Sequence, residues 1–280
     1  MPAARADVLV TAQALAMELA SDHPPVVLDV RWRPEQPDGW DAYIAWHIHR
    51  AVYVKLDTDL ADPFRPASAG RHPLPAQEDF EAAARGWGIR AGSRVVVYDD
   101  NRGMSAARAW WLLRYAGLED VRLLDGGMRA WTGAALPLDT GVTIPERGDL
   151  VARYGALPVI GIDGAAAFPE HGILLDARPS ERYRGEVEPV DPVAGHIPGA
   201  VNAPTAGNLD EHGAFLPEAE LRERFEALGV AGDVAVYSGS GISAGHEAIA
   251  LVLAGFEPAL YPGSWSEWSN HPDRPVETGD

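Results

Sequence analysis

Residues 234–256 read VAVYSGSGISAGHEAIALVLAGF and decide the fold class of this 280-residue chain. The first four residues are an apolar run bounded by polar turns, which is typical of a strand covered on both faces. Further on, the apolar residues of 249–256 recur at helical spacing, and Gly255 is placed to end the helix. A buried strand, a glycine-rich loop and a helix in this order predict an α/β fold.

The two halves of the chain repeat one another in four segments that keep the same order. VVLDVRW at 26–32 matches ILLDAR at 173–178, HIHRAVYVKLD at 47–57 matches HIPGAVNAP at 196–204, RVVVYDDNRGMSAARAWWLLRYAG at 94–117 matches DVAVYSGSGISAGHEAIALVLAGF at 233–256, and VRLLDGGMRAW at 121–131 matches PALYPGSWSEW at 258–268. A solenoid would repeat every 20–50 residues or so. We therefore predict two copies of one domain, at 1–140 and 158–280, joined by a linker at 141–157. Each copy is expected to hold a mostly parallel sheet flanked by helices on both faces.

Composition excludes several classes of function. Lys and Arg total 23 against 41 Asp and Glu, a formal net charge of −18, which disfavours a nucleic-acid binder. The chain contains no cysteine, so it has no disulfide, no thiolate metal site and no cysteine nucleophile.

The sequence shows no run of about 18 apolar residues, and we expect no membrane partner. Residues 1–25 lack the apolar core and cleavage site of a signal peptide. They are better explained by a short strand and an amphipathic helix with Leu15 and Leu19 on one face. The predicted location is the cytoplasm.

The loop after the strand at 234–237 is the candidate site, because ligands gather at the carboxyl ends of parallel strands. Gly239 and Gly241 allow the backbone to turn successive N–H groups inward as an anion-binding nest at a helix N-terminus, with Ser238 at its first position. The alternative is that Ser238 only starts a turn or caps the helix. A C-x5-R phosphatase loop would need Arg where Ala244 stands, and no Walker lysine follows.

The segments LLDAR, ERYRGEVEPVDPVAGHIPGAVN, VYSGSGISA and YPGSWSEW together resemble the tandem-domain rhodanese family, the thiosulfate and 3-mercaptopyruvate sulfurtransferases. The resemblance covers nearly the whole chain. It implies two rhodanese domains, an inactive first one and a catalytic second one. It also implies a small anionic sulfur donor, a thiophilic acceptor such as cyanide, and no metal or organic cofactor. The physiological donor, the acceptor and the oligomeric state stay open.

The main departure from the family is Ser238, which stands at the position of the family's nucleophilic cysteine. The resemblance implies that the thiolate takes the donor's outer sulfur and holds it as a persulfide, and a nest of N–H groups suits such an anion. A serine hydroxyl forms no persulfide, so the chain is predicted to be inactive in persulfide turnover. Ser238 is either a one-atom substitution of a cysteine or a natural divergence. The alternative function is a non-catalytic module that binds an anion or a partner.

Further site residues follow from the resemblance. Arg178 and Arg182 match positions that hold the donor's anionic group, for which a guanidinium fork is suited; the alternative is a surface salt bridge to a nearby acid. Asp57, His72 and Ser240 match a Ser/His/Asp set proposed for the mercaptopyruvate branch, where it handles protons; otherwise Asp57 caps a turn and His72 is structural. The other residues expected around the donor are Gly239, Gly241, Ile242, Ser243 and Ala244.

Further expectations concern the first copy of the loop, two histidines, one turn and the loop serines. Asp99 takes the place of Ser238 in the first copy, and its carboxylate is expected to fill that nest from within. His196 is expected to fix local structure, and His246 to face solvent. The turn in WHIHRA at 46–51 is expected to differ from GHIPGA at 195–200. Serine hydrolysis is disfavoured because neither loop serine lies in a G-x-S-x-G elbow.

Overall fold

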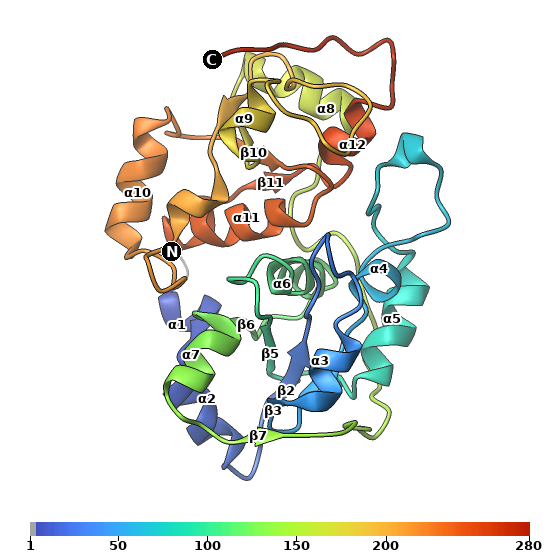
Figure 1. Cartoon of the computed structure of the whole chain (residues 1–280), viewed down its shortest axis with the longest axis vertical. Helices are drawn as coiled ribbons and strands as arrows, with labels where there is room; N and C mark the ends of the chain where they lie inside the picture. The colour runs from blue at the N-terminus through green and yellow to red at the C-terminus, as the bar shows by residue number, and fades with distance from the viewer. Residues whose placement is uncertain (1–3) are drawn as a thin grey trace.

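The computed structural model describes residues 4–280 and shows two α/β domains stacked along the long axis of the molecule (Figure 1). The first sheet has the strand order β1-β6-β5-β2-β4 and the second β11-β10-β8-β9, and every neighbouring pair is parallel. The fold class predicted from sequence is confirmed. The strands of the two sheets are β1 (Leu9–Val10), β2 (Val26–Asp29), β4 (Val52–Tyr53), β5 (Val95–Tyr98), β6 (Val121–Leu124), β8 (Ile173–Asp176), β9 (Val201–Asn202), β10 (Val234–Tyr237) and β11 (Ala259–Leu260).

Helices cover both sheets, and a short antiparallel pair closes one side of the first domain. The helices are α1 (Arg5–Val8), α2 (Ala12–Leu19), α3 (Trp40–Ala45), α4 (Leu56–Asp59), α5 (Gln77–Gly86), α6 (Ala106–Tyr115), α7 (Gly127–Gly133), α8 (Ile162–Ala167), α9 (Ser180–Tyr183), α10 (Glu218–Ala227), α11 (Ser243–Leu253) and α12 (Ser264–Trp268). The antiparallel pair is β3 (His47–Ile48) with β7 (Leu138–Asp139), and three 3-10 turns are η1 (Ala67–Ala69), η2 (Phe168–Glu170) and η3 (Thr205–Asn208). Across residues 4–280 none of the helices has the length and apolarity to cross a membrane.

The structure confirms the elements that were predicted from apolar patterns in the sequence. The apolar runs at 95–98 and 234–237 are fully buried central strands, β5 and β10. Leu15 and Leu19 face the core from α2. Helix α11 ends at Leu253, and Gly255 follows with φ +86°, the left-handed conformation that terminates helices.

The turn at 46–51 differs from its counterpart at 195–200 at the first residue, where Trp46 has φ −169° and Gly195 has φ +125°, but contrary to expectation it is the same after β3. Arg50 has φ +64° and Gly199 has φ +75°, and the following alanine amide donates to the isoleucine carbonyl in both turns, at 2.9 and 3.0 Å. The same turn is therefore made by a non-glycine residue, although a side chain in this conformation costs about 1–2 kcal/mol.

The segment predicted as the linker is packed against the first domain. Its amides donate to carbonyls of the α5–β5 and α6–β6 connections, as in Leu150 N–H to Ile89 O at 3.2 Å and Arg153 N–H to Ala116 O at 2.9 Å. Leu150 and Ala152 are buried. Because the first domain satisfies these backbone groups, the segment 141–157 has a defined path up to the start of the second domain.

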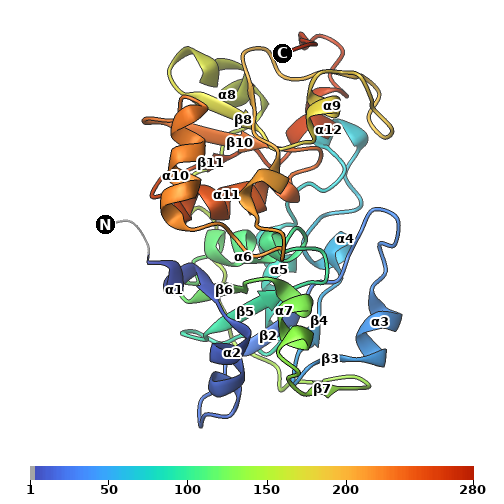
Figure 2. The same ribbon diagram turned by 60° about the vertical axis from the view of Figure 1, so that its left-hand side comes forward.

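Two of the contacts between the domains lie near the candidate site. Helices α6 and α11 pack side by side at the seam, and their apolar faces belong to one continuous core (Figures 1 and 2). In addition, the segment 61–76 leaves the first domain and its turn η1 lies against α12 (Figure 1). There Arg71 N–H donates to Ser266 Oγ at 3.1 Å, and His271 Nε2 lies 3.0 Å from Ser68 O. This segment brings first-domain side chains to the carboxyl edge of the second sheet.

Candidate functional site

The candidate site is the loop between β10 and α11. Ser238 is fully buried, and its Oγ accepts a hydrogen bond from Gly241 N–H at 3.1 Å. Its own N–H donates to Ser264 Oγ at 3.1 Å, and its carbonyl accepts from Trp265 N–H at 2.9 Å. The loop is therefore fixed by α12 on one side, while the amide of Gly241 turns inward toward residue 238.

The corresponding loop of the first domain shows what such a backbone binds. The carboxylate of Asp99 accepts four hydrogen bonds from main-chain N–H groups at 2.8–2.9 Å. The donors are Asn101, Gly103, Ser105 and Ala106. The prediction that Asp99 fills this nest is confirmed. Because an anion of the chain already occupies it, the first loop has no room for an external one.

The structure brings together the three residues of the predicted Ser/His/Asp set. His72 Nδ1 lies 2.8 Å from Ser240 Oγ, and His72 Nε2 lies 3.3 Å from Asp57 Oδ1. Burial lowers the pKa of His72; the hydrogen bond to Asp57 opposes this effect, and the positive charge of Arg108 reinforces it. A neutral imidazole between a hydroxyl and a carboxylate is suited to accept a proton from the hydroxyl side.

Two guanidinium groups lie over the loop, one from each domain. A Cβ placed on Gly239 would be 3.4 Å from Arg182 Nη1 and 3.4 Å from Arg71 Nη2. Arg182 also binds Glu188 at 2.6 Å and Asp191 at 3.2 Å, and Arg71 pairs with Asp191. The acid partner of Arg182 expected as the alternative is thus present, but the guanidinium still faces the loop.

Sequence reasoning missed Arg71. Its one signal is its position next to His72 in RHPLP at 71–75, which places it at the same site. Its partner Asp191 lies in a stretch without periodicity and gives no signal of its own. Ser238 itself has no exposed surface, so a donor reaches residue 238 only when neighbouring side chains move.

The guanidinium of Arg178 is held by acceptors within the second domain. Its guanidinium donates to both carboxylate oxygens of Asp176, at 2.6–3.0 Å, and to the carbonyl of Gly195 at 2.6 Å. In the first domain Arg31 binds Asp29 with the same geometry. The same Asp–Arg pair thus occurs in the first domain, whose nest is filled by Asp99. This repetition favours a structural role for Arg178.

The structure contradicts the expectation for His246 and confirms the one for His196. His246 is fully buried and stacks on Phe215 with ring centroids 4.5 Å apart, so the expectation that it faces solvent is wrong. The reason is that the first turn of α11 lies in the domain seam. His196 Nδ1 lies 2.8 Å from Tyr183 O and its ring stacks on Tyr183, which confirms its structural role.

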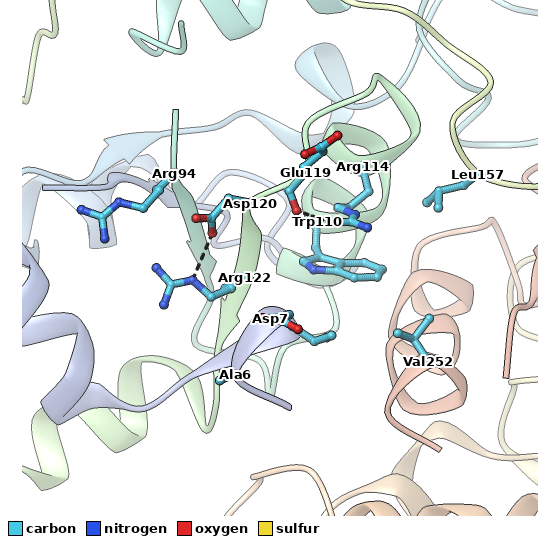
Figure 3. A pocket seen from close by; sticks show the side chains of 11 residues that line it. Ala6, Asp7, Arg94, Trp110, Arg114, Glu119, Asp120, Arg122, Leu157 and Val252 are labelled. Atoms are coloured by element: carbon cyan, nitrogen blue, oxygen red, sulfur yellow. Dashed lines mark hydrogen bonds and ion pairs between the residues drawn. The ribbon is translucent and has the colours of Figure 1, made fainter. Parts of the chain in front are cut away.

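A pocket of about 550 Å³ lies at the other end of α6 and α11, away from the loop (Figure 3). Its charged side chains alternate in sign, with Arg122 and Asp120 paired at 3.4 Å. The charged lining residues are Asp7, Arg94, Arg114, Glu119, Asp120 and Arg122. This balance gives no preference for an anion, in contrast to the loop after β10.

The fold and the loops define a two-domain α/β protein whose first loop is filled by Asp99 and whose second loop carries Ser238 in the corresponding place. The profile of the rhodanese-like domain matches residues 11–134 and 164–271. The chain belongs to the rhodanese family. The loop after β10, the Ser/His/Asp set and the two arginines at Gly239 all lie within these matched ranges.

Several relatives are similar over nearly their full length. SseB of Mycobacterium tuberculosis, whose name assigns it provisionally to the thiosulfate sulfurtransferases, is 44% identical over 99% of this chain and 99% of its own. A Pseudomonas aeruginosa protein, assigned provisionally to the 3-mercaptopyruvate sulfurtransferases, is 46% identical over 97% and 98%. The crystal structure of SseA from Escherichia coli, titled as a 3-mercaptopyruvate sulfotransferase, matches with a TM-score of 0.81 at 31% identity over 92% and 98%. The relatives are thus named for two different donors.

Proposed function

We propose that the loop after β10 is the site of a thiosulfate or 3-mercaptopyruvate sulfurtransferase, and that the chain with Ser238 binds the donor without persulfide turnover. The observation that carries this proposal is the inward amide of Gly241 at 3.1 Å from Ser238 Oγ, under two guanidinium groups. We also retain the domain boundaries and the cytoplasmic location predicted from the sequence. Thiophiles such as cyanide are the proposed acceptors.

Each group has a defined task in this proposal. The donor's anionic end binds Arg182 and Arg71, which face the loop at Gly239. In the Ser238→Cys protein, a thiolate at 238 would attack the donor's outer sulfur; a new S–S bond would form while the donor's bond to that sulfur breaks, and its electron pair would leave with sulfite or with the enolate of pyruvate. His72, between Ser240 and Asp57, relays the proton that the mercaptopyruvate donor requires. The hydroxyl of Ser238 is far less acidic than a thiol and forms no S–S bond.

Ser238→Cys tests this proposal directly. After treatment with thiosulfate or 3-mercaptopyruvate, we expect the intact mass of the variant to rise by one sulfur atom, about 32 Da, because the nest stabilises the reacting thiolate. The unchanged protein should gain nothing. Ser21→Cys is the control, since its thiol lies exposed on the first domain away from the loop, and it should react much more slowly. If the Ser238→Cys variant accepts no sulfur from either donor, the sulfurtransferase proposal fails.

A second candidate, a non-catalytic anion-binding module, is favoured by Ser238 itself. It requires that the unchanged protein bind thiosulfate or sulfite, measured by calorimetry. Arg182→Ala is expected to weaken binding about tenfold or more, because a charge-assisted hydrogen bond is lost. Arg184→Ala is the control: this more exposed arginine lies two residues on and pairs with Glu186 at 2.8 Å. Equal affinity in both variants would contradict an anion site at the loop.

A further inference from the structure

Arg108 is a fully buried arginine of α6 that bonds only to carbonyl oxygens. Its guanidinium donates to Leu60 O at 3.0 and 3.1 Å, to His72 O at 2.9 Å and to Gly241 O at 3.2 Å. Between residues 4 and 280, no carboxylate lies within salt-bridge distance of it. Burial lowers the pKa of Arg108 to about 10, so it remains charged at neutral pH.

The other arginines around the loop are neutralised by acids. Arg71 pairs with Asp191, Arg182 with Glu188 at 2.6 Å, and Arg178 with Asp176 at 2.6 Å. Arg108 therefore contributes a positive charge that no local carboxylate cancels. In a buried environment of low dielectric constant, such a charge acts over a longer range than it would in water.

Two of the carbonyls that Arg108 binds belong to residues of the site. One is that of Gly241, whose N–H donates to residue 238, and another is that of His72, whose ring binds Ser240. A single first-domain side chain thus fixes the loop and the histidine relative to one another. Its charge lies beside Gly241, the residue whose N–H faces position 238.

We propose that Arg108 is a positioning residue of this site, which holds the loop and His72 in register and lowers the pKa of a thiol at position 238. The proposal rests on the proposed function, because it assigns a role toward the thiolate that sulfur transfer requires. It gives the first domain, which has no open nest of its own, a direct part in the chemistry of the second.

The test measures the thiol pKa from the pH dependence of iodoacetamide alkylation in Ser238→Cys protein. Arg108→Gln and Arg108→Met remove the charge, the first with hydrogen-bond donors retained and the second without them; Arg108→Lys retains the charge. We expect both neutral variants to raise the thiol pKa by about one pH unit, with a roughly tenfold slower alkylation at pH 6.5, and the lysine variant to stay near the parent.

Thermal unfolding and near-ultraviolet circular dichroism identify the variants that fold, and either neutral variant suffices for the comparison. A folded neutral variant with the parent's thiol pKa overturns the proposal. So does a lysine variant that shifts as far as the neutral ones, because geometry rather than charge would then set the pKa. Alkylation needs no sulfur donor, so this readout is separate from a failure of the Ser238→Cys protein to form a persulfide.

Discussion

Gly241→Ala in the Ser238→Cys protein is expected to reduce the rate of persulfide formation by at least about 100-fold. Gly241 has φ +79°, and a Cβ there would stand 2.3 Å from the carbonyl oxygen of Pro262. This contact is with backbone, so no side-chain rotation relieves it. The loop must shift, and the amide that faces residue 238 shifts with it.

The first domain offers a matched control for this substitution. Gly103 has φ +82° and donates to Asp99 as Gly241 does to Ser238, but its Cβ would meet side-chain atoms at ordinary contact distances, the methyl groups of Leu123 at 3.4 and 3.5 Å and the ring of His246 at 3.7 Å. Gly103→Ala should cost about 1 kcal/mol of stability through backbone strain and leave persulfide formation unchanged. Rates come from mass spectrometry and stabilities from urea unfolding. A folded Gly241→Ala variant that reacts at the parent's rate would show that the amide of residue 241 is dispensable.

The parts of this molecule that could be predicted from sequence are those decided by neighbours along the chain. Strand β10 is a four-residue apolar run, and the loop after it is defined by its glycines. Asp99 could be placed in its nest because the two halves repeat with the same order of segments. In each case the local pattern determines the local conformation, and the site lies where parallel strands end.

The parts that could not be predicted depend on how the two domains pack. Arg71 reaches the loop only because the segment 61–76 lies against α12, and no periodicity in that segment indicates its path. His246 is buried because α11 packs on α6, which a single helix pattern does not reveal. The role of Arg178 toward the donor stays a prediction; its Asp-x-Arg motif also occurs at Asp29 and Arg31, in the domain expected to be inactive, and this repetition favours a structural role.

Glu247→Gln is expected to stabilise the protein at pH 8 and to leave its stability unchanged near pH 4.5. Glu247 is fully buried in α11, where it accepts a hydrogen bond from Asn208 Nδ2 at 2.7 Å. Arg224 is its nearest cation, at 4.0 Å. Burial raises the pKa of Glu247 to about 7, against an ordinary value of 4.5. Glutamine keeps the acceptor oxygen for Asn208 and removes the ionisable group.

The direction of the pH effect follows from proton binding. Between about pH 4.5 and pH 7 the native carboxyl is protonated while the unfolded one is ionised, so the native state binds more protons. The free energy of unfolding then falls as the pH rises through this window, by about 3 kcal/mol in total. Below the window both states are protonated and this loss is absent, so the parent and the glutamine variant should converge there.

Urea unfolding at pH 4.5, 6 and 8 measures this difference, which should grow with pH to about 3 kcal/mol in favour of the glutamine variant. Glu226→Gln is the control: Glu226 is exposed on α10 and pairs with Arg222 at 2.8 Å, so its replacement should shift stability by less than about 0.5 kcal/mol at every pH. A difference for Glu247→Gln that stays constant with pH would mean that Arg224 keeps the carboxylate ionised in the native state. In that case α11 would carry a buried negative charge, which would oppose the anion that we propose at the loop before its N-terminus.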